Sequence, residues 1–223
     1  HARATDGGRE LDGVLNIDKP AGITSHDVVN RVRRILNIKR VGHAGTLDPL
    51  ATGVLLVCVA QATRIVDFMM DGEKEYNGVM VMGVTMDTED SSGQVQSEVD
   101  ASHITMASLA EALPGYTGEI YQAPPMVSAA HHQGKRLYEL ARQGKVVDRE
   151  PKLVNVKEIE LTGFEPGAHP NASLRVVCSK GLYIRTLFAD IGATLGVGAH
   201  MSQLRRTRIG RFAIDSAINL DTL

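Results

Sequence analysis

Runs of apolar and alternating residues predict several strands. Tyr76, Gly78, Met80 and Met82 recur at every second position, which would place them on one face of a strand. The continuous apolar run Val54 to Ala60 is typical of a strand that is buried on both faces. The strands expected in this way cover Leu11 to Asp18, Val54 to Ala60, Lys74 to Thr85, Val154 to Leu161 and Ser173 to Ser179.

Apolar residues at helical spacing predict helices between these strands. Thr24, with Asp27 three residues later, has the pattern of a helix N-terminus ahead of an apolar stripe. Gln61 to Met70 is expected to be a helix with Ile65, Val66 and Met69 facing inward. Further helices are expected from Thr105 to Leu113, from Leu137 to Gln143 and from Leu182 to Leu195, where Gly196 ends the last of them.

Strands and helices do not alternate strictly along the chain, as they do in parallel α/β folds. The pattern therefore predicts the α+β class, with a mixed, mainly antiparallel sheet and flanking helices. A chain of 223 residues with 43% hydrophobic content can bury a substantial core. Its longest apolar run is far shorter than the roughly 18 residues of a membrane span. Residues 1–10 are polar and are expected to be a disordered tail or a cloning remnant, so a cytoplasmic location is expected.

The two cysteines carry no metal-binding or disulfide signature. Cys58 and Cys178 each lie inside a strand-like apolar run, and the sequence has no CxxC pattern. Buried thiols are expected for both, and no metal site is expected anywhere in the chain.

Charge is distributed very unevenly, although the net charge is only -2. Residues 1–64 carry 9 basic and 6 acidic side chains (+3), residues 65–119 carry 1 and 11 (-10), and residues 120–212 carry 14 and 7 (+7). Such segregation indicates a protein with one face toward a polyanion and another toward water. The alternative is a surface of randomly mixed charge. For Arg31, Arg33 and Arg34, phosphate contact and a solvated helix face are both open.

Most common catalytic motifs are missing. No GxxxxGK[ST] phosphate loop and no GxSxG nucleophile elbow occur, and the glycine pair Gly196 and Gly198 follows an expected helix rather than a strand. Nucleotide-cofactor and ordinary hydrolase chemistry are therefore poorly supported.

The stretch Gly42 to Leu55, GHAGTLDPLATGVL, is the best candidate for catalytic chemistry. Three glycines allow tight turns and the close approach of a bulky substrate, while Pro49 restricts Asp48 to extended conformations. An aspartate has an unperturbed pKa of about 3.9, so it is ionised at neutral pH and can act as a nucleophile without a companion base. The alternative is that Asp48 merely forms an Asx-type turn.

Several motifs together resemble one family. GHAGTLDPLATGVL, Lys19-Pro20, the strand containing Tyr76, KGLYIRTL at 180–187 and LRRTRIGRF at 204–212 closely resemble the TruB family of tRNA pseudouridine synthases. This resemblance covers about Leu11 to Leu220 and implies the pseudouridine synthase catalytic fold. It further implies isomerisation of uridine 55 in the T arm of tRNA to pseudouridine, with no metal and no organic cofactor.

The resemblance also assigns roles to individual residues. Asp48 matches the catalytic nucleophile, Tyr76 the aromatic residue that stacks on the target base, and Arg185 the arginine that pairs with the aspartate. Stacking worth roughly 1–3 kcal/mol per base would offset much of the cost of extruding the uridine. The remaining substrate-binding residues are His43, which would fill space vacated in the RNA stack, Leu204, an apolar wall of the pocket, Tyr183 and Lys19.

Other interpretations of three of these residues stay open. Tyr76 could be a core aromatic residue, Arg185 a charge on a helix face and His43 an ordinary loop histidine. The mechanism is also open, because the aspartate could attack either C1′ of the ribose or C6 of the uracil.

Residues 121–152 concentrate basic side chains after Pro124-Pro125 and resemble the family's thumb insertion, which clasps RNA. The residues concerned are His131, His132, Lys135, Arg136, Arg142, Lys145, Arg149 and Lys152. The expected organisation is a single catalytic domain over 11–223, without the C-terminal PUA domain of many bacterial members, and a monomer is expected. Two other functions compete: a non-catalytic RNA-binding or remodelling protein, and a guide-RNA-dependent synthase subunit.

Overall fold

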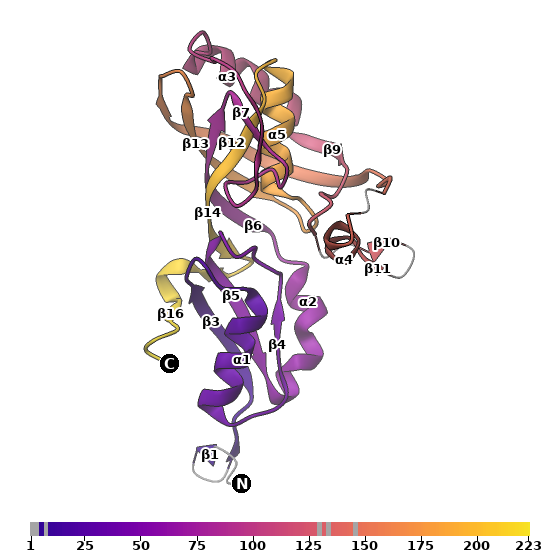
Figure 1. Cartoon of the computed structure of the whole chain (residues 1–223). Coiled ribbons are helices and arrows are strands. Elements are labelled where there is room, and N and C mark those ends of the chain that lie inside the picture. The colour runs from indigo at the N-terminus through magenta and orange to yellow at the C-terminus, as the bar shows by residue number, and fades with distance from the viewer. Residues whose placement is uncertain (1–4, 7–8, 129–130, 133–134, 145–146) are drawn as a thin grey trace. The chain divides into compact units, whose positions relative to one another are not determined.

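The structure is a computed structural model that describes residues 5–6, 9–128, 131–132, 135–144 and 147–223. The chain divides into two compact units. The first contains residues 1–76 together with 204–223, and the second contains residues 77–203. Strands β6 (Lys74–Met82) and β14 (Ala199–Ile209) each begin in one unit and end in the other (Figure 1).

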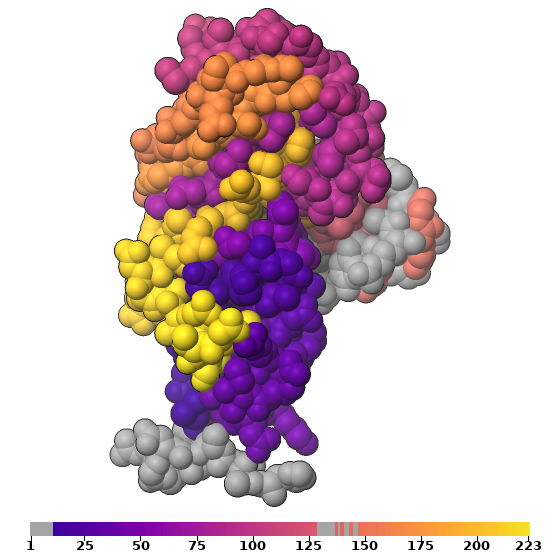
Figure 2. Space-filling view, turned by 60° about the vertical axis from the view of Figure 1, so that its left-hand side comes forward, coloured from indigo at the N-terminus to yellow at the C-terminus, as the bar shows by residue number. Residues whose placement is uncertain are grey.

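The first unit is built on a sheet that joins the two ends of the chain. Strand β3 (Gly13–Lys19) pairs antiparallel with β5 (Thr52–Val59), and β5 also pairs antiparallel with β4 (Val41–Ala44). On the same edge of β5 as β4, and opposite to β3, strand β14 pairs in parallel with Thr52 and Gly53. The short strand β16 (Ile218–Asn219) pairs in parallel with β3. Figure 2 shows the C-terminal residues, in yellow, lying against the N-terminal part of this unit.

Helix α1 (Ser25–Leu36) covers this sheet because its apolar residues recur at helical spacing. Thr24 caps the helix, since its side chain accepts a hydrogen bond from the backbone of Asp27 and the Asp27 side chain accepts one from the Thr24 backbone. The core formed by the helix and the sheet contains Val28, Val29 and Val32 together with Ile17, Val41, Leu55, Val57, Val59 and Leu220. Complete burial of such side chains contributes about 1.5–3 kcal/mol each.

The arginines of α1 differ in their contacts. Arg31 forms an ion pair with Asp221, and Arg33 donates a hydrogen bond to the Val41 carbonyl at 2.9 Å. Arg34 is exposed on the last turn. Arg33 therefore serves the fold of the first unit in part, because it ties the end of the helix to β4.

The predicted helix over Gln61 to Met70 is only partly correct. Ala60–Ile65 forms the 3-10 helix η1, and the α-helix α2 covers Val66–Met70. Val66 and Met69 pack against the core as expected, but the prediction that Ile65 faces inward is wrong, because 44% of its surface is exposed. A 3-10 helix has three residues per turn instead of 3.6, so the inward face is out of phase with an α-helical pattern.

The second unit contains the sheet order β6-β13-β12-β9. Strand β12 (Lys152–Glu165) pairs antiparallel with β13 (Asn171–Cys178) and with β9 (Gly118–Gln122). Strands β7 (Val84–Met86) and β8 (Val95–Glu98) form a separate antiparallel pair. The helical elements are α3 (Met106–Ala112), which Thr105 caps as predicted, η2 (Leu113–Tyr116) and α5 (Ile184–Thr194), which buries Leu187, Phe188 and Ile191.

The expected thumb insertion contains short elements. Strand β10 (His131–His132) pairs with β11 (Lys135–Arg136), and α4 (Leu137–Arg142) follows, close to the predicted helix. Lys145 lies outside the described residues. The RNA-clasping role of this segment stays a prediction.

The short elements at the two ends of the chain complete the description. In the N-terminal stretch, β1 (Thr5–Asp6) pairs with β2 (Arg9–Glu10). Near the C-terminus, β15 (Phe212–Ala213) pairs with β14, and η3 (Ile214–Ser216) precedes β16.

The predicted fold class is confirmed. Antiparallel pairs predominate in both units, and helices flank the sheets. Cys58 and Cys178 are buried thiols, as expected. In the part of the chain that the structure describes, no helix is long and apolar enough to cross a membrane.

One glycine controls the contact between β5 and β14. Gly53 is paired with Arg206 in the register of the two strands. Its φ is +100°, a backbone conformation that residues other than glycine rarely adopt. A Cβ atom added at this position would lie 2.2 Å from the carbonyl oxygen of Arg206, a backbone atom that cannot rotate away. The pairing therefore requires glycine for two independent reasons.

We predict that Gly53→Ala lowers the free energy of unfolding by about 3 kcal/mol or more, because it adds a backbone collision to an unfavourable φ. Gly118→Ala is the matched control, since Gly118 has a φ of +93° and open space where its Cβ would be. This control should cost only about 1–2 kcal/mol. Urea unfolding followed by circular dichroism measures both; equal losses would contradict the role given to the Arg206 contact.

Candidate active site

Asp48 lies on a loop between β4 and β5 that is held by hydrogen bonds to Ser25. Ser25 Oγ accepts a hydrogen bond from Leu47 N at 2.9 Å and donates one to Leu47 O at 3.1 Å. Leu47 and Ala51 are buried on either side of Asp48, and Ala51 N donates to Asp48 O at 3.0 Å, closing a tight turn. The loop therefore holds a half-buried carboxylate between two anchored positions.

Lys19 connects this loop to the turn after β3 by hydrogen bonds to both. The lysine is completely buried, and its Nζ donates to Pro20 O at 2.8 Å, Ile23 O at 2.7 Å and Pro49 O at 3.3 Å. Burial lowers the pKa of Lys19 to about 8, although the nearby carboxylate of Asp48 opposes this shift. The structure thus brings Lys19 close to Asp48, while the substrate-binding role of Lys19 stays a prediction.

Arg206 is a second buried cation beside the loop, and the sequence analysis did not single it out as a site residue. Only 1% of its surface is exposed, and its guanidinium donates to the carbonyl oxygens of Val54 (2.8 Å), Gly45 (2.8 Å) and Thr46 (3.4 Å). The signal was present in LRRTRIGRF, because Arg206 follows Leu204 at the two-residue spacing that places both on one face of a strand.

Tyr76 lies on β6 close to this arginine. The centroid of its ring is 6.0 Å from the Arg206 guanidinium carbon, and 7% of the residue's surface is exposed. Leu204 is also nearly buried, with 9% of its surface exposed, and its carbonyl oxygen accepts a hydrogen bond from Thr52 Oγ1 at 3.4 Å. Tyr76 therefore contributes to the core while its ring borders the arginine that holds the Asp48 loop.

His43 occupies β4 opposite Val57 and is half-buried. Burial is the main cause that lowers its pKa, and the positive charge of Arg206 acts in the same direction. Its Nδ1 atom is buried and has no hydrogen-bond partner among the described residues. His43 is accordingly a neutral imidazole next to the loop rather than a cation that would pair with phosphate.

Arg185 and Tyr183 belong to the second unit, at the start of α5. Only 3% of the surface of Arg185 is exposed, and its guanidinium donates to the carbonyl oxygens of Thr88, at 3.1 Å, and Val127. The buried Gln122 side chain donates to Tyr183 O at 3.1 Å and accepts from Tyr183 N at 2.8 Å. The Gln122 side chain thus holds the backbone of Tyr183, and nothing in the sequence around Gln122 pointed to this contact.

The predicted residues therefore fall into two groups. Asp48, Lys19, His43, Tyr76 and Leu204 belong to the first unit, and Arg185 and Tyr183 belong to the second. Arg185 lies at the start of helix α5, and only 3% of its surface is exposed, so it is not a solvated surface charge. Pairing between Arg185 and Asp48 stays a prediction, because each unit is described by itself.

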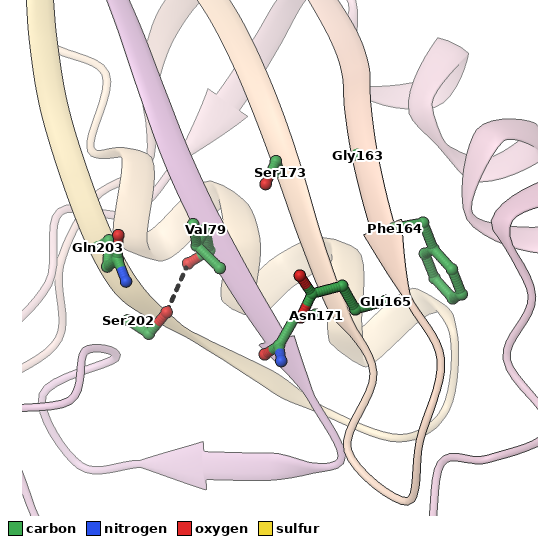
Figure 3. Close-up of a pocket in the computed structure, with 8 residues that line it drawn as sticks. All are labelled: Val79, Gly163, Phe164, Glu165, Asn171, Ser173, Ser202 and Gln203. Atoms are coloured by element: carbon green, nitrogen blue, oxygen red, sulfur yellow. Dashed lines mark hydrogen bonds between the residues drawn. The ribbon is translucent and has the colours of Figure 1, made fainter.

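A hollow of about 250 Å³ in the second unit contains none of these residues. Val79, Ser202 and Gln203 line one side of it, and Figure 3 shows the hydrogen bond from Ser202 Oγ to Val79 O, 3.4 Å long. Residues of β12 and β13 line the other side. Among the described residues, no group of three or more His, Cys, Asp or Glu side chains could hold a metal ion. The Asp48 loop is therefore the best-supported candidate site.

Two family models match this chain and together cover residues 33–223. Residues 33–184 match the N-terminal domain of the TruB family pseudouridylate synthases. Residues 185–223 match the C-terminal domain of tRNA pseudouridylate synthase B. Asp48 and Tyr76 lie within the first match, while Arg185 and Leu204 lie within the second.

Known proteins with similar sequences and structures agree with these matches. The chain is 52% identical to tRNA pseudouridine synthase B of Symbiobacterium thermophilum, over 96% of this chain and 72% of the relative. It is 50% identical to the protein of the same name from Saccharophagus degradans, over 97% of this chain and 69% of the relative.

Among solved structures, a chain in "Crystal Structure of a Cbf5-Nop10-Gar1 Complex" is 35% identical, with a TM-score of 0.72. The match covers 94% of this chain and 52% of that chain, so this chain spans about half the length of the solved one. The matched domains, the sequence identities and the structural likeness lead to one assignment. The chain belongs to the TruB family of pseudouridylate synthases, a family of isomerases.

Proposed function

We propose that this protein isomerises uridine 55 in the T arm of tRNA to pseudouridine, with Asp48 as the nucleophile. The observation that carries the proposal is the identity of 50–52% to two tRNA pseudouridine synthases B over nearly the whole chain. The anchored, half-buried carboxylate of Asp48 supports the same chemistry, because an ionised aspartate can attack without a companion base.

In the proposed reaction, the target uridine leaves the RNA stack and enters the pocket, where the Tyr76 ring receives the base. The Asp48 carboxylate attacks either C1′ of the ribose or C6 of the uracil, and the bond between C1′ and N1 breaks. The released uracil rotates and forms a new bond from C5 to C1′, and the bond between Asp48 and the substrate breaks, which regenerates the carboxylate. The C5 proton is then lost and N1 gains a proton, so the product is an isomer of the substrate.

Two buried cations support the ionised form of the nucleophile. Lys19 interacts electrostatically with Asp48, and both Lys19 and Arg206 donate hydrogen bonds to carbonyl oxygens of the loop. Positive charge near a carboxylate in a dry pocket favours its ionised form. Arg185 is proposed to pair with Asp48, as the family resemblance implies, and the burial of Arg185 supports a site role.

The remaining roles of the proposal concern RNA binding. Leu204 is proposed to form an apolar wall, and its near burial on the same strand face as Arg206 supports this. His43, neutral and half-buried, suits the space left by a displaced base better than a phosphate contact. The basic residues of the segment 121–152 are proposed to clasp the T arm, and a monomer is proposed to suffice.

A guide-RNA-dependent reaction is the second candidate. Two similar solved structures, a Cbf5-Nop10-Gar1 complex at 35% identity and an H/ACA RNP bound to a substrate RNA at 32% identity, favour it. The higher identity to tRNA pseudouridine synthases B favours the stand-alone reaction. The two candidates differ in whether the purified protein needs partners.

We expect the purified protein alone to form pseudouridine in an unmodified T-arm stem-loop. Chemical mapping of the product RNA locates the modified position, and a stem-loop in which cytidine replaces the target uridine is the control. Activity that requires added guide RNA or partner proteins would support the second candidate. Tight RNA binding without product would indicate a non-catalytic RNA-binding protein.

Asp48→Asn should lower the rate of tritium release from 5-tritiated uridine in tRNA at least about 10⁴-fold, a loss of about 5.5 kcal/mol of transition-state stabilisation. The amide has nearly the same shape as the carboxylate but is a poor nucleophile. Asp67→Asn on the exposed surface of α2 is the matched control and should leave the rate unchanged. Wild-type release by the Asp48 variant would exclude the assigned nucleophile.

The charge of Lys19 should make the reaction sensitive to alkaline pH. With a pKa of about 8, the ammonium group is present below pH 8 and is lost as the pH rises through 8. We expect the ratio of the wild-type rate to the Lys19→Met rate to fall about threefold between pH 7 and 9. For a pKa of about 8 this corresponds to a full effect of about fivefold, or about 1 kcal/mol of charge interaction at the carboxylate. Titrations shared by both proteins cancel in this ratio, and a constant ratio would contradict the role of Lys19.

A further inference from the structure

We propose that Arg206 is a positioning residue that holds the Asp48 loop and the Tyr76 ring in one fixed arrangement. This inference rests on the proposed function, because it explains how the nucleophile and the base-stacking ring are held for the same reaction. Arg206 acts through its neighbours and is not itself proposed to touch the reacting atoms.

The hydrogen bonds of Arg206 reach the loop on both sides of Asp48. The guanidinium reaches Gly45 and Thr46 before Asp48 in the chain, and Val54 after it. One side chain thus bridges both ends of the segment that carries the nucleophile. The backbone of the same residue contacts Gly53, so the segment is held from the strand as well.

The Arg206 guanidinium also lies over the Tyr76 ring. The guanidinium carbon lies 6.0 Å from the ring centroid, at the outer limit of a cation–π interaction. Tyr76 and Asp48 come from different elements, and Arg206 contacts both the tyrosine ring and the aspartate loop. A shift of this guanidinium would therefore displace the two groups relative to each other.

The surroundings of Arg206 suit an arginine better than a lysine. Burying a charge is costly unless hydrogen bonds compensate for the lost water, and Arg206 is 99% buried, with 1% of its surface exposed. The planar guanidinium offers five donors in a fixed fork, whereas a lysine ammonium is a compact point charge. The Nε, Nη1 and Nη2 atoms of Arg206 each donate to a different carbonyl oxygen, before and after Asp48 in the chain, which matches the geometry of the fork.

The test compares Arg206→Lys and Arg206→Met with the matched variants Arg205→Lys and Arg205→Met. Arg205 is adjacent in sequence but half-exposed, and it forms an ion pair with Asp18 at 2.8 Å. We expect Arg206→Lys to lower the single-turnover rate on T-arm RNA at least about tenfold and Arg206→Met at least about a hundredfold. The Kd for the RNA should change less than about threefold, and the Arg205 variants should keep the wild-type rate.

Hydrogen–deuterium exchange gives a readout that does not depend on activity. Peptides covering residues 44–55 should exchange at least about tenfold faster in both Arg206 variants and not in the Arg205 variants. If the wild-type protein forms no pseudouridine, the proposed function fails, while the exchange data still test the loop.

Three outcomes would overturn the inference. The first is a rate within about threefold of wild type in both Arg206 variants. The second is unchanged exchange over 44–55. The third is the loss of folding in both Arg206 variants, because Arg206 would then be a general determinant of the fold rather than a residue that positions the site.

Discussion

The close contact between β5 and β14 controls the geometry of the candidate site. Gly53 lets the backbone of β5 approach Arg206 at a distance that no Cβ atom would permit. This approach places the Arg206 side chain under the loop that precedes β5, where its guanidinium meets three carbonyl oxygens. The position of Asp48 therefore depends on a backbone contact five residues away along the chain.

Electrostatics follows from this packing. A buried guanidinium and a buried ammonium lie beside one loop, and their mutual repulsion contributes to the lowered pKa of Lys19. Both cations are held by carbonyl oxygens, which compensate for lost hydration without neutralising the charge. Lys19 interacts electrostatically with Asp48, and positive charge close to a carboxylate favours its ionised form.

The sequence predicted elements well where one local rule dominates. The Thr24 cap, the alternating face of β6 and the buried strand β5 all follow from side-chain periodicity and capping chemistry. The orientation of Ile65 was predicted wrongly because apolar spacing alone does not distinguish an α-helix from a 3-10 helix over so few residues.

Site residues were predictable to a different degree. Motif resemblance selected Asp48, Tyr76 and Arg185, which local physics alone could not distinguish from a turn, a core aromatic residue and a surface charge. Arg206 and Gln122 were missed because their roles consist of contacts with backbone atoms far away in the sequence. The spacing in LRRTRIGRF placed Arg206 on the same strand face as Leu204, but the backbone partners of Arg206 and Gln122 depend on strand register, which a single strand does not encode.

In both units, a buried polar side chain forms hydrogen bonds to the backbone of a segment that carries a proposed site residue. In the first, the Arg206 side chain binds backbone carbonyl oxygens of the Asp48 loop; in the second, Gln122 binds the backbone of Tyr183, next to Arg185. In both cases a buried polar side chain fixes a main-chain segment that carries a proposed functional group. The hydrogen bonds reach backbone atoms, so this support does not depend on the side chains of the loop, whereas Gly45, with a φ of +78°, requires glycine. The support does not tolerate replacement of the buried side chain, because unsatisfied buried carbonyl and amide groups would remain.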